Sequence, residues 1–307
     1  MRYGYLGPEG TFTEAALKSL PPGPEPAESV PFPTVQGALA AVRDGTVQRA
    51  VVPLESSVEG IVTATVDDLA AAADLMISAE LQLPIAFALL TSGPASLSDI
   101  KTVGGHPQAL AQCRHWLHRR LPHADQVPAA SNAEAARRVA EGTLEAALAG
   151  AFAAEKYGLT ITEDNVQDSS AAVTRFVVVS PAGEPLPAPT STDRTSLAAF
   201  LTEDHAGALM EILTEFAVRG INLTTIQSRP TGAGLGSYYF FIDCEGHLDD
   251  ARVGEALMGL RRVCGDIRFL GSYPRCDGGA THVRPGTSDH EFAEAAAWLG
   301  RLRFGRS

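Results

Sequence analysis

Short apolar runs separated by helix-like stretches mark the first part of the chain. The clearest run, Val177–Val179, is β-branched, which is typical of a strand buried on both faces. Similar runs predict strands at Arg2–Leu6, Arg49–Val52 and Lys101–Val103, and the stretch Asp74–Leu90 also reads as strands. Strands that alternate with helices predict an α/β fold.

Capping residues indicate where the helices begin. Thr11 and Glu14 have the spacing of a capping box, and Ser131–Glu134 repeats that spacing. Pro107 suits the first position of a helix. Helices are predicted over Phe12–Leu20, Thr34–Arg43 and Ile61–Ala73, from Pro107 through Leu117, and up to Ala140, with loops over Pro21–Pro33 and Pro53–Gly60.

A second domain follows a proline-rich linker, PAGEPLPAPTSTD, at Pro181–Asp193. Its elements read strand, helix, strand, strand, helix, strand, which is the split-βαβ, ferredoxin-like order. In the tail from Cys276 to Ser307, the sequence predicts one helix near Glu291–Leu302. This helix would pack on a domain or on a partner subunit. The six elements of the second domain are predicted at Thr195–Leu201, Gly207–Arg219, Ile221–Ser228, Ser237–Asp243, Asp249–Val263 and Asp266–Tyr273, with a glycine-rich turn at Thr231–Gly236.

Charge and cysteine content narrow the class of protein. The chain has 307 residues and a formal net charge of −12, which disfavours nucleic acid and anionic membranes as partners. The four cysteines (113, 244, 264 and 276) are scattered, which argues against a zinc site or disulfide framework. No apolar run approaches a membrane span and no signal-peptide pattern opens the chain, so cytoplasmic residence is expected.

Three stretches carry candidate chemistry, each with an ordinary structural alternative. Thr174–Phe176 puts a hydroxyl, a cation and an aromatic at the start of the buried strand; the alternative is a polar strand start with Arg175 in a surface ion pair. The turn Gly7–Thr11 before a helix suits an anion, or is a plain strand-to-helix turn. Glu55–Ser57 forms a hydrogen-bonding site, or caps a helix. His106 is interpreted as a loop histidine, since no acid stands beside it.

Five ordered motifs resemble the prephenate dehydratase family. Four lie in the first domain, and the second domain resembles an ACT domain through GALMEIL and IQSRP. The first-domain motifs are YLGPEGTFTEAA at Tyr5–Ala16, VVPLESSVEGIV at Val51–Val62, GHPQALAQC at Gly105–Cys113 and TRFVVV at Thr174–Val179. The resemblance covers nearly all of residues 1–276 and suggests the monofunctional form.

The resemblance implies a domain organisation. It suggests a catalytic domain at residues 1–181 with two α/β lobes, similar to periplasmic binding proteins, and a site in the cleft between them. One lobe would comprise about 1–80 plus 166–181, and the other about 81–165. A linker at 182–193, an ACT domain at 194–275 and a tail at 276–307 would follow. Homodimers or homotetramers are expected.

The resemblance also implies roles for particular residues. Thr174 matches the family's essential threonine, Glu55 and Ser57 match its Glu-Asn-Ser/Thr motif, and Gln112 matches the glutamine of its His-Pro helix. Thr174 is expected to stabilise charge on the hydroxyl oxygen that leaves the substrate ring, or to relay a proton to it. Glu55, if buried and protonated, is the alternative acid. Substrate contacts are expected from Thr11, Phe12, Ser56, Ser57, Gln112, Ser131, Asn132, Arg175 and Phe176.

Phenylalanine is the expected effector, bound by the ACT domain between subunits. No metal, nucleotide or flavin is required by the implied reaction, which converts prephenate to phenylpyruvate in phenylalanine synthesis. Effector contacts are expected from Ala206, Gly207, Ala208, Leu209, Asn222, Leu223, Gln227 and Ser228.

The sequence departs from the family pattern at several positions. Ser56 stands where Asn is usual, Gly105 where some members have Ser, and Ala171 and Ala172 where an Asn usually precedes Thr-Arg-Phe. Gln227 replaces the usual Glu of the effector motif. Two alternatives therefore stay open: a diverged homologue that uses arogenate or only decarboxylates prephenate, and a non-catalytic amino-acid sensor.

Overall fold

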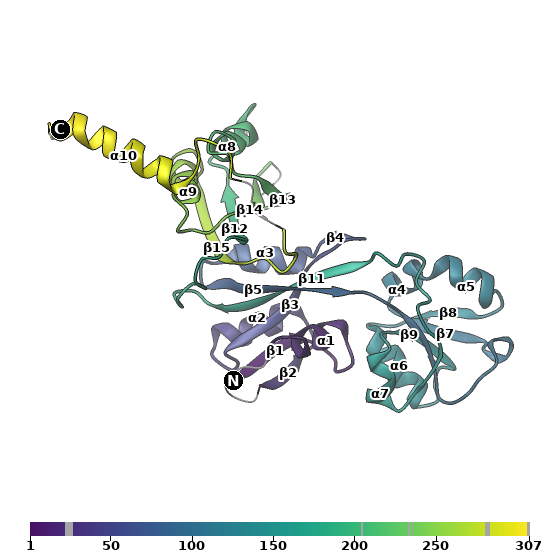
Figure 1. Cartoon of the computed structure of the whole chain (residues 1–307). Coiled ribbons are helices and arrows are strands. Elements are labelled where there is room, and N and C mark those ends of the chain that lie inside the picture. The colour runs from purple at the N-terminus through teal and green to yellow at the C-terminus, as the bar shows by residue number, and fades with distance from the viewer. Residues whose placement is uncertain (22–26, 204, 233, 235, 280–282, 306–307) are drawn as a thin grey trace. The chain divides into compact units, whose positions relative to one another are not determined.

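The chain divides into two compact units in this computed structural model. The first comprises Met1–Thr65 and Leu81–Val178, and the second comprises Val66–Glu80 and Val179–Ser307. The structure describes residues 1–21, 27–203, 205–232, 234, 236–279 and 283–305. Figure 1 shows the elements of both units.

A six-stranded sheet begins in the first unit. Its order is β2 (Glu28–Phe32), β1 (Arg2–Leu6), β3 (Arg49–Ser56), β11 (Val173–Pro181) and β5 (Leu75–Pro84), with β4 (Gly60–Ile61) paired to β3. β1 is parallel to both β2 and β3, as helical crossovers require. β5 and β11 continue from the first unit into the second. The helices of this part are α1 (Phe12–Lys18), α2 (Val35–Arg43) and α3 (Thr63–Ala71).

A five-stranded sheet forms the other lobe of the first unit. Its order is β10 (Thr160–Glu163), β6 (Ala88–Thr91), β9 (Ala146–Ala149), β7 (Thr102–Gly105) and β8 (Asp125–Pro128). Apolar side chains on its strands and helices form two buried clusters. Its helices are η1 (a 3₁₀ turn, Leu97–Asp99), α4 (Pro107–Gln112), α5 (Arg114–Arg120), α6 (Asn132–Ala140) and α7 (Phe152–Tyr157).

Three local predictions in the first unit were wrong. The predicted loop Pro21–Pro33 contains edge strand β2, where prolines are tolerated because one side of the strand is unpaired; its residues 22–26 lie outside the described part. The predicted loop Pro53–Gly60 gives its first residues to β3 and its last to β4. The helix predicted from Pro107 through Leu117 is two helices that meet at Cys113.

The break at Cys113 has a structural reason. The Asp168 carboxylate accepts hydrogen bonds from the backbone N–H groups of His115 (2.9 Å) and Trp116 (3.0 Å). These are first-turn amides of α5, which need an outside acceptor at a helix start. A residue far away in the sequence thus starts a new helix.

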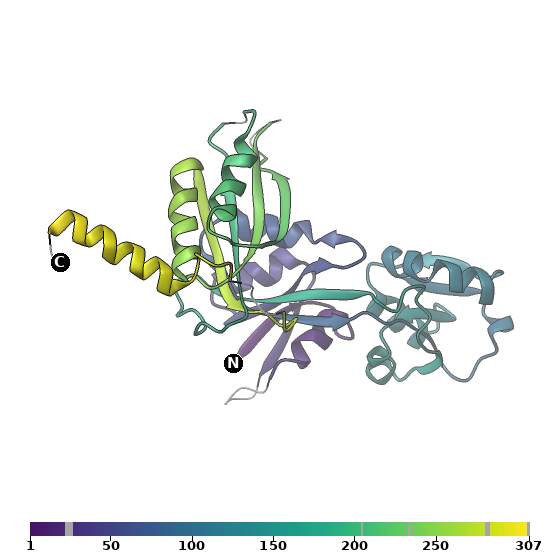
Figure 2. The same cartoon turned by 45° about the horizontal axis from the view of Figure 1, so that its top comes forward.

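The second unit contains the predicted ferredoxin-like fold. An antiparallel sheet has the order β13 (Leu223–Pro230), β14 (Tyr238–Glu245), β12 (Asp193–Phe200) and β15 (Asp266–Pro274). Helices α8 (Ala208–Ala217) and α9 (Ala251–Val263) cover one face of it (Figure 2). Side chains from β12, β14, α8 and α9 share one apolar core. Residues 233 and 235 of the predicted turn Thr231–Gly236 lie outside the described part.

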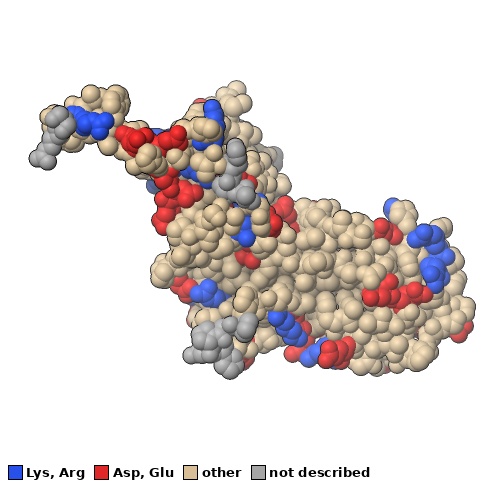
Figure 3. Space-filling model, in the orientation of Figure 1, with Lys and Arg blue, Asp and Glu red and all other residues tan. Residues whose placement is uncertain are grey.

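The predicted tail helix is present as α10 (Asp289–Phe304). Ser288 and Glu291 form a complete capping box at its start, and Asp289 accepts a hydrogen bond from the Ala251 amide of α9 (2.8 Å). Acidic side chains occupy its first turn and basic ones its last turn, which favours the helix dipole (Figure 3). Residues 280–282 and 306–307 of the tail lie outside the described part.

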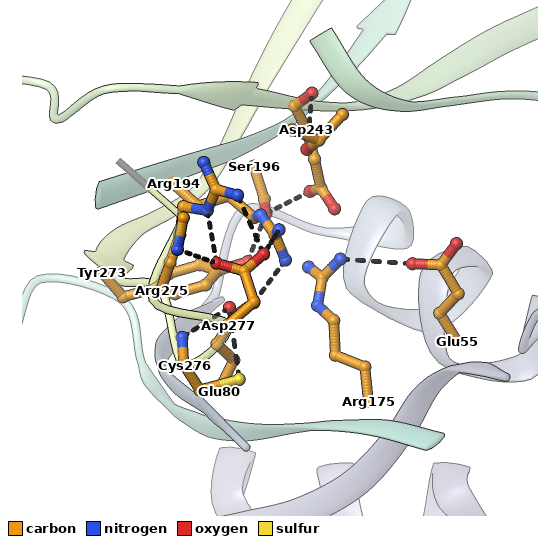
Figure 4. Close-up of polar contacts among 12 residues, drawn as sticks. Glu55, Glu80, Arg175, Arg194, Ser196, Asp243, Tyr273, Arg275, Cys276 and Asp277 are labelled. Atoms are coloured by element: carbon orange, nitrogen blue, oxygen red, sulfur yellow. Dashed lines mark hydrogen bonds and ion pairs between the residues drawn. The ribbon is translucent and has the colours of Figure 1, made fainter. Parts of the chain in front are cut away.

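A buried ionic cluster lies in the second unit (Figure 4). The Glu80 carboxylate of β5 accepts a hydrogen bond from Arg194 of β12 (2.6 Å), and the two side chains are 0% and 6% exposed. The backbone N–H of Cys276 also donates to Glu80 (3.0 Å). Arg275 pairs with Asp277 and with Glu245. Ionic groups at this depth are tolerated only when paired.

The Glu80–Arg194 pair predicts a large effect on stability. Glu80→Gln leaves the Arg194 cation buried without its main partner, so we expect a loss of about 3 kcal/mol in the free energy of unfolding. Urea unfolding followed by circular dichroism measures it. Glu141→Gln, in the exposed pair with Arg137, is the control. A loss for Glu80→Gln no larger than for this control would contradict the prediction.

Candidate functional site

A pocket of about 460 Å³ lies in the first unit, lined by residues of both lobes. Phe12, Ser56 and Thr63 come from the part with the six-stranded sheet, and Gln112 and Asn132 from the part with the five-stranded sheet. Apolar side chains make up much of the lining, and a few polar groups converge on it. This combination is typical of a small-molecule site.

Strand β11 places Thr174 and Phe176 in the pocket lining. Successive side chains of a strand point to opposite faces, so Arg175 between them points away. Arg175 is buried, and its Nη1 lies 3.4 Å from Oε2 of Glu55 (Figure 4). The ordinary interpretation of Arg175 as an ion-pair residue therefore describes its placement, although the pair is not on the surface.

Glu55 does not line this pocket. Its side chain is 36% exposed rather than buried, and its Oε2 lies 3.4 Å from Nη1 of Arg175. The structure thus brings Glu55 together with Arg175 and does not bring either to Thr174 in the pocket.

The two serines after Glu55 have different surroundings. Ser57 does not line the pocket; its Oγ accepts a hydrogen bond from the Val173 amide (2.9 Å), and its own amide donates to the Val173 carbonyl (2.9 Å). This paired contact secures the start of β11 beside Thr174. Ser56 does line the pocket, and its Oγ accepts from the amides of Val58 (3.3 Å) and Glu59 (3.4 Å).

Helix starts account for the other predicted contacts of the first lobe. Thr11 caps α1 through Glu14 and is outside the pocket lining. Phe12, the next residue, is in the lining and packs edge-to-face on Phe87 (5.5 Å) and Phe152 (5.2 Å between ring centroids). The aromatic side chains of Phe12 and Phe87 line the pocket at this helix start, and the anion-binding turn stays a prediction.

On the second lobe, Ser131 caps α6 and is outside the lining. Asn132 lines the pocket, and its Oδ1 accepts a hydrogen bond from the His106 amide (2.8 Å). Gln112 also lines the pocket; its Oε1 is buried, and no described residue donates to it. An uncompensated buried oxygen in a pocket indicates a place for a ligand donor or a water.

The structure adds pocket residues that the sequence analysis did not assign to the site, among them the histidine that it interpreted as a loop residue. Gln108 and His106 line the pocket from the α4 side, and Glu59 from the β3–β4 side. Gln108 Nε2 donates to Glu59 Oε2 (2.5 Å), so a hydrogen bond joins the two lobes at the pocket. Gln108 could have been found from its spacing, because it lies four residues before Gln112 on one helix face.

The positions that depart from the family pattern are also placed. Ser56 and Ala172 line the pocket, and Ala172 is almost fully buried. Gly105 is buried at the end of β7. Two short side chains therefore stand at the pocket where the resemblance led us to expect an Asn.

The predicted effector residues fall in two groups within the second unit. Gly207 has φ 101° and precedes α8, and Leu209 is 39% exposed. Asn222 is exposed just before β13. Gln227 on β13 donates from Nε2 to the Ser228 carbonyl (3.2 Å). Ala206 and Ala208 flank Gly207, and Leu223 begins β13.

The described residues bear on two other classes of function. They contain no group of three or more histidine, cysteine, aspartate or glutamate side chains arranged to hold a metal ion. None of the described helices has both the length and the apolar composition needed to cross a membrane.

Comparison with known proteins decides the family. A prephenate dehydratase family model matches residues 3–184, and an ACT domain model matches residues 197–262. The chain belongs to the prephenate dehydratase family. A curated prephenate dehydratase from Mycobacterium tuberculosis H37Rv is 46% identical over 313 aligned positions, covering 100% of this chain and 95% of the relative.

Two solved structures are similar to this chain over most of its length. A prephenate dehydratase from Arthrobacter aurescens, crystallised in complex with L-Phe, is 46% identical, has a TM-score of 0.93, and is matched over 98% of this chain and 99% of that chain. GqqA, described as a quorum-quenching acylase, is 30% identical with a TM-score of 0.80, over 89% of this chain and 98% of that chain. The predicted family, the α/β and ferredoxin-like folds, and the lyase class are confirmed.

The buried oxygen of Gln112 predicts a binding role. Gln112→Leu keeps the shape of the side chain and removes its amide, so we expect KM for prephenate to rise roughly tenfold with little change in the thermal unfolding midpoint. Steady-state kinetics measure it, with Gln126→Leu on edge strand β8 as the control. An unchanged KM would remove Gln112 from the binding site.

Proposed function

We propose that the pocket of the first unit binds prephenate and that the Thr174 hydroxyl assists departure of the ring hydroxyl. The observation that carries this proposal is the position of Thr174 in the lining of a pocket that also contains the Gln112 and Asn132 amides. Ser57, through Val173, and Glu55, through Arg175, hold the strand that presents Thr174.

The reaction explains which groups the pocket must supply. The bond between the ring and its carboxylate breaks, and its electron pair moves into the ring as carbon dioxide leaves. The carbon–oxygen bond of the ring hydroxyl then breaks, and the departing hydroxide takes up a proton to give water. The ring becomes aromatic, so the barrier lies in expelling a poor leaving group. A hydrogen-bond donor aimed at that oxygen lowers the barrier.

Thr174 suits the role of a donor that stabilises rather than ionises. A threonine hydroxyl is a very weak acid, so its contribution is a hydrogen bond to the charge that develops on the leaving oxygen. Phe12 and Phe176 in the lining exclude water, which strengthens such a bond. We assign Glu55 the role of holding Arg175 and strand β11, because it lies outside the lining.

The two carboxylates of prephenate need anchors in a chain of negative net charge. We propose that amide donors supply them. Asn132 is the first residue of α6, whose N-terminus carries the positive end of the helix dipole. The side-chain amides of Gln108 and Gln112 face the same pocket from α4. Neutral donors of this kind bind an anion without a buried cation.

We propose L-phenylalanine as the effector of the ACT domain. The relative that was crystallised with L-Phe is 46% identical to this chain over nearly its whole length. The proposed contacts are the start of α8, from Ala206 to Leu209, and the region from Asn222 to Ser228. The proposed site lies between subunits of a homodimer or homotetramer, and cytoplasmic residence remains a prediction.

We also keep the domain division as a proposal, with the catalytic domain at 1–181, a linker at 182–193, the ACT domain at 194–275 and a tail at 276–307. One assay separates the proposed function from three alternatives: arogenate as the substrate, decarboxylation alone, and no catalysis. Purified protein is incubated with prephenate, and phenylpyruvate is followed by ultraviolet absorbance.

Thr174→Val tests the central assignment. Valine keeps the branched shape at Cβ and removes only the hydroxyl, so we expect the fold and KM to persist while kcat falls by roughly 100-fold or more. Thr160→Val on β10, outside the pocket lining, is the matched control. Turnover by Thr174→Val close to that of the unmodified enzyme would refute the role.

Effector binding gives a separate prediction. Isothermal titration calorimetry should show L-phenylalanine binding to the full chain, and Asn222→Ala should weaken it by roughly tenfold because one polar contact is removed. Basal turnover without phenylalanine should stay unchanged in this variant. The absence of any binding heat with the unmodified protein would count against the effector assignment.

A further inference from the structure

Helix α3 begins in the first unit and continues into the second. Thr63 and Ala64 in its first turn line the pocket. Asp67, one turn further on, belongs to the second unit together with the ACT domain. Four residues of helix cover only about 6 Å along the axis. One short, continuous element therefore contributes to both places.

Asp67 is held by two residues of the ACT sheet. Its two carboxylate oxygens accept hydrogen bonds from Arg229, at 2.9 Å from Nε and 2.6 Å from Nη2. Tyr239 Oη donates a third hydrogen bond to Oδ1, at 2.7 Å. Arg229 is on β13, and Tyr239, which is buried, is on β14. A two-pronged arginine–carboxylate contact fixes orientation as well as distance.

A third ACT strand holds the end of α3. Arg268 of β15 donates from Nη1 to the Ala70 carbonyl, and its guanidinium lies 4.5 Å from the centre of the Phe200 ring. A cation at the last carbonyls of a helix is favourable because these carry partial negative charge. Three of the four ACT strands thus contact a single helix.

The N-terminal part of α3 is hydrogen-bonded to strand β3 beside the pocket. Thr65, which is fully buried, donates from Oγ1 to the Pro53 carbonyl (2.6 Å), and the Val62 amide donates to the Leu54 carbonyl (2.7 Å). Pro53 and Val62 line the pocket. A displacement of α3 therefore moves pocket residues on the helix and on strand β3.

The protonation states of Asp67 and Tyr239 favour the hydrogen bond between them. Burial raises the pKa of the Asp67 carboxyl, but hydrogen bonds from Arg229 and Tyr239 outweigh it and hold the pKa below the ordinary value. Burial and the Asp67 carboxylate raise the pKa of Tyr239 above its usual range. The carboxylate stays ionised and the phenol stays protonated near neutral pH, so both hydrogen bonds are present there.

We propose that Asp67 is a positioning residue through which the ACT sheet sets the place of the first turn of α3 in the substrate pocket. Arg229 follows the proposed effector residues Gln227 and Ser228 directly in the chain. Phenylalanine bound there changes the hold on Asp67, and the pocket responds through α3. This inference rests on the proposed function of the pocket and describes how phenylalanine bound to the ACT domain regulates that pocket.

Two conservative variants test the route. Asp67→Asn removes the charge and one acceptor oxygen, and Tyr239→Phe removes a single hydroxyl. Tyr238→Phe, on the preceding and half-exposed tyrosine, is the matched control. For each full-length protein we measure kcat and KM for prephenate, the ratio of rates with and without saturating phenylalanine, and amide hydrogen exchange of the segment that contains residues 62–65.

We expect both variants to raise KM roughly fivefold with kcat little changed, to bring the rate ratio towards one, and to speed exchange in the segment. Tyr238→Phe should match the unmodified protein. KM, rate ratio and exchange all unchanged in both variants would overturn the proposal, as would a change confined to the unfolding midpoint. Unmodified protein that makes no phenylpyruvate would instead overturn the proposed function, and the exchange data would still test the link to α3.

Discussion

The alternation of side chains along β11 is the constraint on which the site depends. Because neighbours point to opposite faces, one strand sends Thr174 into the pocket and the buried Arg175 into an ion pair with Glu55. The ion pair and the two hydrogen bonds between Ser57 and Val173, one to the Ser57 hydroxyl and one from its amide, hold the strand in register. A shift by one residue would exchange the hydroxyl for a guanidinium in the pocket.

The chain has a negative net charge, and its substrate carries two carboxylates. The pocket must therefore attract anions locally, against the charge of the whole chain. The lining of this pocket offers amides and a helix start, and the only arginine in the β11 motif is turned away. On the face shown in Figure 3, acidic and basic side chains lie in small separate groups among uncharged residues. The proposed recognition of the anion therefore uses oriented dipoles rather than a cationic surface.

The second unit combines the ACT fold with a part of the chain that comes from the first half of the sequence. Glu80 accepts from Arg194 and from the Cys276 amide, and Asp67 accepts from Arg229 and Tyr239. Ionic contacts of this kind tolerate little displacement, because a charged group that loses its partner is left without compensation. They join the helix α3 and the strand β5 to strands of the ACT sheet.

Sequence alone determined the elements whose signals are local. Capping boxes located α1 and α6, the Val177–Val179 run located β11, and the order of six elements established the ferredoxin-like domain. Only the tertiary structure decided which side chains meet: Glu55 lies with Arg175 and not with Thr174, Gln108 reaches Glu59, and Asp168 divides one expected helix into two. The reason is physical, since a residue's type and spacing follow from its neighbours in the chain. Its partners depend on strand register and helix packing between segments that are distant in sequence.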